Sequence, residues 1–221
     1  MKIKALIFDL DGTLLNTLTS INYYLNKTLK SYGFDEITLK QTGIFVGDGA
    51  AKLVVRALEF QGYDTRANEA RVKEITGTYV ADYDSAPEYL TAPYEGIPEL
   101  LWELKKRGYK LGVVSNKPHS TVAPLVLKFF GDVFDFVMGG KEGIRLKPHP
   151  DMPALALSEL GVLNTEVMYL GDTSTDMLTG KGFSAGKTVG VSWGFRDREE
   201  LVENGADAVV DKPAEILNML E

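Results

Sequence analysis

Two aspartates separated by one residue follow a short apolar run near the start of the chain. The run Ala5–Phe8 is typical of a buried strand, and Asp9 and Asp11 come directly after it, with Gly12 and Thr13 next. A carboxylate at the end of a strand can serve as a nucleophile or a metal ligand, and a second one can exchange protons with a leaving group. An Asp-Gly pair is also an ordinary turn signal, so this stretch alone leaves both interpretations open.

Two later apolar runs also end in polar side chains. Ser115 closes one of them, and Asp172 and Asp176 follow the other. Continuous apolar runs are typical of parallel strands buried on both faces, and open α/β sheets bind ligands at the carboxyl ends of such strands. We therefore expect these groups at one edge of a sheet, together with the first two aspartates.

Carboxylates gathered at one edge repel one another and lose their charge unless a cation joins them. The chain has no cysteine, and no histidine belongs to this set, so oxygen ligands and Mg²⁺ are favoured over zinc. Lys147, Ser115 and the turn at Gly12 offer positive charge and hydrogen-bond donors to a phosphate. Such a set is typical of phosphoryl transfer through an aspartyl phosphate.

Helical and strand patterns alternate along the chain from about residue 96 onward. Together with the opening run, strands are expected at residues 3–8, 111–115, 134–138, 167–170, 188–191 and 208–210. Helices are expected at residues 97–107, 121–130, 152–160, 174–181, 197–203 and 213–220. This alternation predicts the α/β class, with a doubly wound parallel sheet.

A long segment after the first strand breaks this alternation. Helical patterns without a convincing strand appear near residues 18–32, 49–61 and 67–83. Prolines and glycines cluster where the alternating pattern resumes, as in a linker. We predict an α-helical domain of residues 17–93, inserted into an α/β catalytic core made of residues 1–16 and 94–221.

Four motifs resemble those of the haloacid dehalogenase (HAD) superfamily and occur in that family's order. They are DLDGT at 9–13, VVSN ending at 116, KPHP at 147–150 and GDTSTD at 171–176. A lone D-x-D pair would be weak evidence, whereas four ordered motifs with a helical insert after the first are specific. The resemblance implies a Rossmann-like core with an α-helical cap domain.

The resemblance also implies the catalytic and metal-binding roles. Asp9 is expected to attack phosphorus and become the aspartyl phosphate, and Asp11 to act as general acid and then as general base. A halide leaving group needs no proton but an alkoxide does, so Asp11 indicates a phosphatase rather than a dehalogenase. Mg²⁺ is expected to bind the Asp9 carboxylate, the Asp11 carbonyl and Asp172, with Asp176 bound directly or through metal waters.

Four further motif residues are expected to bind the substrate. By the same resemblance, Ser115 and the Asn116 amide bind the phosphate, Lys147 neutralises the charges of Asp9 and the phosphate, and Thr13 fixes the loop. Lys147 therefore counts as a catalytic residue as well as a substrate-binding one.

The insert is expected to select the substrate. The stretch FVGDGAAKLVVRAL at 45–58 resembles the cap loop and helix of phosphoglycolate phosphatases. Gly47, Asp48 and Gly49 are candidate substrate contacts, because amides before a helix bind anions, although a plain helix start is an equal alternative. Lys52 and Arg56 fit a solvated helix face better than a ligand site. Trp102 and Trp193 are expected in packing, within the core or against the insert.

The expected function is Mg²⁺-dependent hydrolysis of a small phosphomonoester, with 2-phosphoglycolate as the best single substrate. The alternatives on the same scaffold are a pyrophosphatase, a sugar-phosphate or nucleotide phosphatase, and a β-phosphoglucomutase-like phosphomutase. A non-catalytic binding module is the alternative outside enzymes, but its signature would be loss of Asp9 or Asp11, and both are present.

Charge and hydropathy narrow the partners. The net charge of −7 disfavours non-specific binding to nucleic acid or to anionic membranes. The first apolar run is too short for a signal peptide, and no run approaches the roughly 20 residues of a membrane span. We expect a cytoplasmic monomer or homodimer whose partner is a small phosphorylated metabolite.

Overall fold

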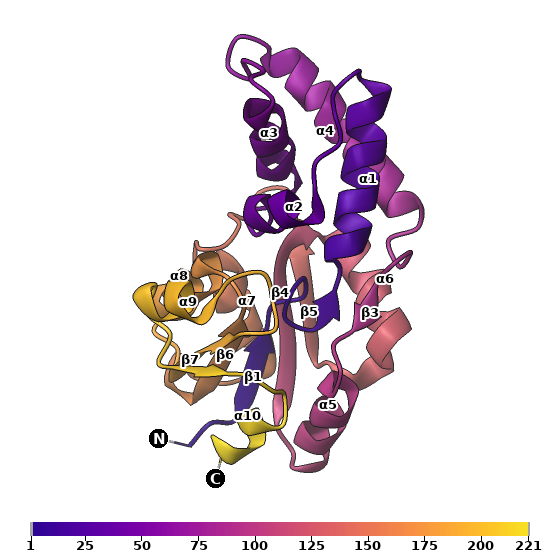
Figure 1. Cartoon of the computed structure of the whole chain (residues 1–221). Helices are drawn as coiled ribbons and strands as arrows, with labels where there is room; N and C mark the ends of the chain where they lie inside the picture. Colours follow the sequence, from indigo (N-terminus) through magenta and orange to yellow (C-terminus); the bar gives the residue numbers. More distant parts are fainter. Residues whose placement is uncertain (1, 221) are drawn as a thin grey trace. The chain divides into compact units, whose positions relative to one another are not determined.

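The computed structural model describes residues 2–220, and the chain forms two compact units (Figure 1). One unit contains the residues up to Asn16 and those from Ala92 onward, and the other is Thr17–Thr91. The chain leaves the first unit after β2 (Leu15–Asn16) and returns to it at β3 (Ala92–Pro93). These two strands form a short antiparallel ladder within the first unit. The domain boundaries proposed from the sequence stay a prediction.

A six-stranded parallel sheet forms the centre of the first unit. In spatial order its strands are β5 (Phe136–Gly140), β4 (Lys110–Pro118), β1 (Ala5–Phe8), β6 (Val167–Gly171), β7 (Lys187–Val191) and β8 (Ala208–Val210). The chain runs outward from β1 through β4 to β5, then crosses to β6 and runs outward to β8. The strand order therefore reverses beside β1, which is where open α/β sheets hold ligands.

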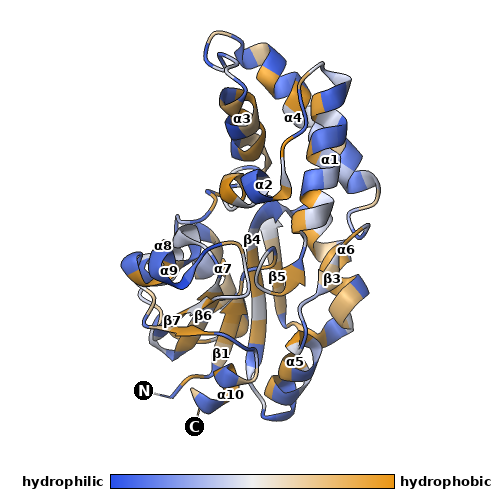
Figure 2. Ribbon diagram, in the orientation of Figure 1, coloured by the Kyte–Doolittle hydropathy of each residue, from blue (hydrophilic) through white to orange (hydrophobic). Residues whose placement is uncertain are grey.

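Strand β1 packs on both faces, which explains its unbroken apolar run. Leu6 and Phe8 belong to one buried cluster, and Ala5 and Ile7 belong to another on the opposite face. Successive side chains of a strand point to opposite faces, so a strand covered on both sides has no polar alternation. In Figure 2 the strands β1, β6 and β7 are mainly orange, whereas the helices alternate between blue and orange.

Helices cover the two faces of this sheet. They are α5 (Ile97–Lys106), α6 (His119–Phe130), α7 (Asp151–Leu160), α8 (Ser174–Gly182), α9 (Arg198–Glu203) and α10 (Glu215–Asn218), with 3₁₀ turns η1 (Gly131–Val133) and η2 (Asn164–Glu166). The cluster around Leu6 takes side chains from α5 and α6, and the cluster around Ile7 takes them from α7. These layers confirm the predicted α/β class.

In the second unit, all the regular elements within the described residues are helices. They are α1 (Leu18–Ser31), α2 (Leu39–Phe45), α3 (Ala50–Phe60) and α4 (Glu69–Ser85). Its buried side chains include three packed tyrosines. The ring centroid of Tyr83 lies 5.3 Å from that of Tyr24 and 6.0 Å from that of Tyr79. Within residues 2–220, no helix combines the length and apolar character that a bilayer-spanning segment requires.

Helix α2 was not predicted. Its buried residues are Thr42 and Gly43, while its apolar Leu39 and Ile44 are exposed, so it carries no apolar period for sequence analysis to detect. The local signal is instead a capping box, in which Thr38 and Gln41 each accept a hydrogen bond from the other's backbone amide. Strands β2 and β3 were also missed, because two residues are too few to show a period.

The packing of β1 predicts a specific loss of stability. Leu6→Ala removes a fully buried side chain and should lower the free energy of unfolding of the first unit by about 2–5 kcal/mol. Leu163→Ala is the matched control, because that leucine is 65% exposed and its loss should cost less than about 0.5 kcal/mol. Both tryptophans, Trp102 and Trp193, lie in this unit, so fluorescence during urea unfolding measures it. Equal midpoints for the two variants would contradict this packing.

Candidate active site

Asp9 lies at the carboxyl end of β1, beside the point where the strand order reverses. Its amide donates to the Leu170 carbonyl at 2.9 Å, which continues the pairing of β1 with β6 by one residue. The residue is 7% exposed. The sheet therefore fixes the backbone that carries this carboxylate, and only its side chain leaves the strand.

Lys147 joins two of the site's carboxylates. Its ammonium lies 2.7 Å from Asp9 Oδ1 and 2.8 Å from Asp176 Oδ1, and the residue is 5% exposed. Its backbone is held by the side chain of Asn116, whose Oδ1 accepts from the Lys147 amide at 2.7 Å and whose Nδ2 donates to the Lys147 carbonyl at 3.1 Å. The Asn116 side chain thus anchors the loop that delivers the ammonium.

Asp172 is fully buried directly after β6. Its Oδ1 accepts from the Thr13 hydroxyl at 2.9 Å, and its Oδ2 accepts from the Phe195 amide at 2.8 Å. Two glycines make room for it, because a Cβ at Gly12 would lie 2.2 Å from Asp172 Oδ2 and one at Gly194 would lie 2.2 Å from Asp172 Cβ. Gly12 also has a positive φ of 87°, so a side chain there is excluded twice.

Asp176 lies in the first turn of α8 and caps it. Its Oδ2 accepts from the Thr173 hydroxyl at 2.6 Å and from the Thr173 amide at 3.1 Å, which completes a capping box. The phenol of Tyr169, from β6, donates to Asp176 Oδ1 at 3.3 Å. Asp176 therefore serves both the helix start and the carboxylate cluster.

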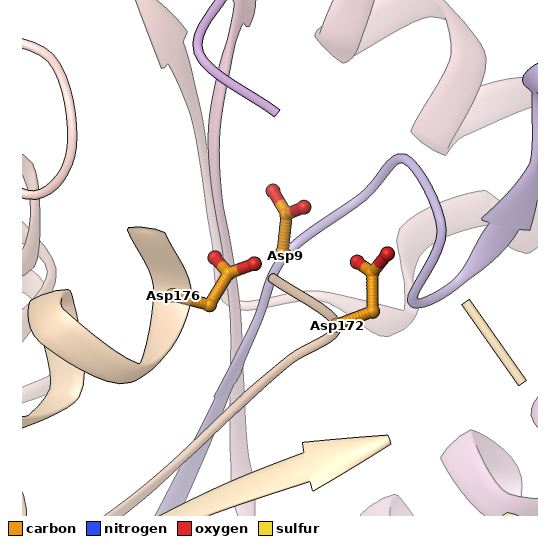
Figure 3. A group of neighbouring side chains, drawn as sticks. All are labelled: Asp9, Asp172 and Asp176. Carbon is orange, nitrogen blue, oxygen red and sulfur yellow. The ribbon is translucent and has the colours of Figure 1, made fainter. Parts of the chain in front are cut away.

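The carboxylates of Asp9, Asp172 and Asp176 lie next to one another (Figure 3). An oxygen of each lies within 4.8 Å of an oxygen of the others, and all three are buried. Burial is the largest effect on the pKa of Asp9 and raises it to about 7, against the attraction of Lys147. Burial and then the charges of Asp176 and Asp9 raise the pKa of Asp172 well above its usual range. Burial opposes the charge of Lys147, but Asp176 and Asp9 still raise its pKa above the ordinary value.

The cluster fits a divalent cation. Lys147 pairs with two of the three carboxylates, so a dication would compensate the negative charge that remains. The donors are oxygens, which suits hard ions such as Mg²⁺ and disfavours zinc. Of the residues predicted to bind the metal, Asp9, Asp172 and Asp176 bring their carboxylates together. Asp11 was predicted to bind through its backbone carbonyl, which stays a prediction, and its carboxylate is paired with a lysine.

That lysine is Lys117. Its ammonium lies 3.0 and 3.1 Å from the two carboxylate oxygens of Asp11, and its side chain is 9% exposed. The Lys117 amide donates to the Ser115 hydroxyl oxygen at 3.2 Å. Pairing of β4 with β5 shifts register between Val114 and Pro118, so these residues lie in an irregular stretch. Bulges of this kind redirect side chains next to active sites.

The predicted loop Gly47-Asp48-Gly49 connects α2 to α3 in the helical unit. Both glycines have positive φ, and Arg56 holds the loop by pairing with the Asp48 carboxylate and donating to the Phe45 carbonyl at 2.7 Å. Arg56 is therefore engaged with its own loop, not with solvent alone as expected. Lys52 matches the expected exposed position, since its side chain is 64% exposed. A substrate-binding role for the loop stays a prediction.

Several residues that shape the site were missed by sequence analysis. Sequence analysis gave Lys117 no role, although a lysine two residues after Ser115 was a signal of a second cation. Trp193 was assigned to packing, yet its indole N–H also donates to the Thr13 carbonyl at 3.0 Å. Trp102 was expected in packing too and is 64% exposed, with the ammonium of Lys106 over its ring. The packing expectation for Trp102 is wrong.

Residues 6–190 match the model of one protein family, the haloacid dehalogenase-like hydrolases. The chain belongs to this family. The match covers the four motifs that carry the site, and it confirms the superfamily and the hydrolase class predicted above.

The relatives of this chain are phosphatases by name. A phosphoglycolate phosphatase of Pectobacterium atrosepticum is 30% identical over 99% of this chain and 92% of its own length. Pyrophosphatase PpaX of Bacillus cereus is 31% identical over 100% of this chain and 97% of its own length. The crystal structure of a candidate phosphoglycolate phosphatase of Lactobacillus delbrueckii subsp. bulgaricus matches this chain with a TM-score of 0.94. The two chains are 32% identical, and the match covers 100% of this chain and 99% of the other. These names support the predicted class of phosphoric monoester hydrolase.

The carboxylate cluster predicts that stability falls as pH rises when no metal is present. The folded-state pKa of Asp9 is raised to about 7, from about 3.9 in an unfolded chain. Between these values the folded state binds more protons than the unfolded state, so the free energy of unfolding decreases with pH. In EDTA we expect the midpoint of thermal unfolding to drop between pH 5 and pH 7.5. Mg²⁺ at pH 7.5 and 100 times its Kd should restore about 2.7 kcal/mol.

Two variants separate this effect from ordinary titration. Asp172→Asn should remove the stabilisation by Mg²⁺ and weaken the pH dependence, because one carboxylate of the cluster is gone. Asp132→Asn is the control, since Asp132 is exposed and outside the cluster, and it should behave as the parent protein. A metal response that survives in Asp172→Asn would rule this carboxylate out as a ligand.

Proposed function

We propose that the chain is a Mg²⁺-dependent phosphatase of small phosphomonoesters, with 2-phosphoglycolate as its preferred substrate, acting through an aspartyl phosphate on Asp9. One observation carries the proposal. The Asp9 carboxylate stands buried at a strand end, 2.7 Å from the ammonium of Lys147 and beside two further carboxylates. Such a carboxylate is rigidly held, and a bound cation keeps it ionised and ready to attack.

Formation of the aspartyl phosphate is the first step. An oxygen of Asp9 bonds to phosphorus while the bond from phosphorus to the ester oxygen breaks. The ammonium of Lys147 offsets the charge that Asp9 and the phosphate bring together. Mg²⁺, when bound at the three carboxylates, supplies further positive charge to the phosphate oxygens.

Proton transfer is the proposed task of Asp11. Its carboxylic acid gives a proton to the leaving alkoxide, and the resulting carboxylate then takes a proton from the water that attacks phosphorus. That second attack breaks the bond between phosphorus and Asp9, releases inorganic phosphate and restores both aspartates. Asp11 is suited to this exchange, because it follows Asp9 by two residues and its side chain is not part of the carboxylate cluster.

Phosphate binding falls to groups at the ends of β1 and β4. Ser115 is 2% exposed at the irregular end of β4, and its hydroxyl and the Asn116 amide are the proposed donors to phosphate. Thr13 uses its hydroxyl on Asp172, so its proposed contribution to binding is to hold the loop after β1 in shape.

The choice of 2-phosphoglycolate is supported by two similar proteins that are named phosphoglycolate phosphatases and are 30% and 32% identical to this chain. Gly47, Asp48 and Gly49 are the proposed substrate contacts from the helical unit, and the Arg56 clamp gives their loop a defined shape. We further propose a cytoplasmic enzyme, monomeric or homodimeric, that takes a small phosphorylated metabolite.

Pyrophosphate is the second candidate substrate. A pyrophosphatase is 31% identical over nearly the full length of both chains. An N-acetylmuramic acid 6-phosphate phosphatase of Pseudomonas aeruginosa, 29% identical, adds a sugar phosphate to the compounds that the names of the relatives contain. The same core residues serve either substrate, so only a direct comparison ranks them.

The nucleophile is tested by Asp9→Asn. Phosphate release from 2-phosphoglycolate, pyrophosphate, hexose phosphates and nucleotides should require Mg²⁺, should stop in EDTA and should be undetectable in the variant, because an amide cannot attack phosphorus. 2-Phosphoglycolate should have the highest kcat/KM. Asp132→Asn should keep full activity, since Asp132 is exposed elsewhere. Equal release by Asp9→Asn and the parent would exclude Asp9 as the nucleophile.

The proton donor is tested by Asp11→Asn with two leaving groups. Glycolate leaves as an alkoxide and needs a proton, so its release should slow by about 10²–10⁴-fold. p-Nitrophenolate is a stable anion and should leave rapidly in the first turnover, after which the aspartyl phosphate hydrolyses slowly. Stopped-flow absorbance should therefore record a burst of one equivalent of p-nitrophenolate. A uniform loss for both substrates without a burst would contradict the assignment.

A further inference from the structure

The ion pair between Lys117 and Asp11 is one feature of the core that the proposed reaction does not use. The ammonium lies 3.0 Å from one carboxylate oxygen of Asp11 and 3.1 Å from the other, and the side chains are only 9% and 18% exposed. Nothing in the two chemical steps requires a second cation there, because Lys147 already serves Asp9 and Asp176. A nearly buried lysine with no catalytic task needs another explanation.

The backbone holds this ammonium at the reactive edge of the sheet. Lys117 lies in the irregular last part of β4, its amide donates to the Ser115 hydroxyl oxygen, and β4 is paired directly with β1. Lysine is a compact charge that can serve more than one acceptor, as Lys147 does in this same site. The ammonium of Lys117 can in the same way hold Asp11 and an anion of the substrate.

The geometry of the ester decides which anion reaches it. In the proposed reaction Asp11 contacts the ester oxygen, so an ammonium one hydrogen bond from Asp11 lies on the leaving-group side of the phosphate. The carboxylate of 2-phosphoglycolate is one carbon removed from its ester oxygen. In pyrophosphate the second phosphoryl group is attached to the bridging oxygen itself. A simple alkyl ester has no anion at this place.

We propose that Lys117 is a specificity-determining residue that binds a second anionic group next to the ester oxygen, the carboxylate in the case of 2-phosphoglycolate. This inference rests on the proposed phosphatase function and narrows its substrates to phosphate esters whose leaving group is itself anionic. Charge-assisted hydrogen bonds to an ammonium with little access to water are among the stronger polar contacts, so the preference should be large.

The test compares two substrates that differ only in that anion. Ethyl phosphate replaces the carboxylate of 2-phosphoglycolate by a methyl group, and both release an alkoxide. The measured quantity is the ratio of their kcat/KM values in Mg²⁺. The parent enzyme should prefer 2-phosphoglycolate by about 10–100-fold. Lys117→Met keeps the length of the side chain without its charge and should bring the ratio close to one, mainly through KM. Pyrophosphate should lose kcat/KM in that variant as well, if it is a substrate.

Two further variants guard the interpretation. Lys117→Arg keeps the charge and should keep most of the preference for 2-phosphoglycolate. This variant still tests the role of the charge if Lys117→Met does not fold. Lys141→Met makes the same change at an exposed lysine and should leave the ratio as in the parent. Tryptophan fluorescence during thermal unfolding establishes that each variant is folded.

The outcomes separate this inference from the proposed function. A parent enzyme that hydrolyses both esters equally overturns the role of Lys117 and leaves the phosphatase standing. An equal loss for both esters in Lys117→Met also overturns it, because the lysine then only orients Asp11. No metal-dependent release from either ester, or from pyrophosphate, overturns the proposed function itself and the inference with it. A ratio that collapses in Lys117→Met and persists in Lys117→Arg supports the assignment.

Discussion

An excess of buried negative charge is the constraint on which the core depends. Asp9, Asp172 and Asp176 bring their carboxylates within 4.8 Å of one another, and one ammonium, that of Lys147, lies among them. Burial, and to a smaller extent repulsion, oppose ionisation here and raise the pKa of Asp9. A buried cluster of this kind, with strongly perturbed pKa values, is typical of functional sites, and its charge suits a cation.

Much of the surrounding structure serves to hold these carboxylates still. Donors from three separate segments point at them: the Thr13 hydroxyl, the Tyr169 phenol with the Thr173 hydroxyl, and the Phe195 amide. Glycines complete the cradle, since the backbone near Asp172 approaches too closely for a side chain. Trp193 extends this support by fixing the carbonyl of Thr13. The chemistry is thus placed on a rigid sheet edge, as preorganised sites require.

Chemistry and selection are divided between different residues. The motif carboxylates and Lys147 are suited to any phosphate ester, which agrees with the different phosphate compounds in the names of the relatives. Residues beside the leaving group are the ones able to distinguish esters. Lys117 is the residue proposed for this task in the core. In the helical unit, the loop held by Arg56 carries the proposed substrate contacts.

The sequence by itself determined the fold class and included the three carboxylates of the cluster in a predicted set of four, in which Asp11 was the fourth. Unbroken apolar runs ending in aspartate predict parallel strands and the edge at which their side chains meet, because both are consequences of burial on two faces. The tertiary structure alone decided the partners. Lys117 and Asp11 are 106 residues apart, and they meet because β4 lies beside β1, an order that no local pattern records. Helix α2 was not predicted from the sequence because it buries Thr42 and Gly43 and so shows no apolar period.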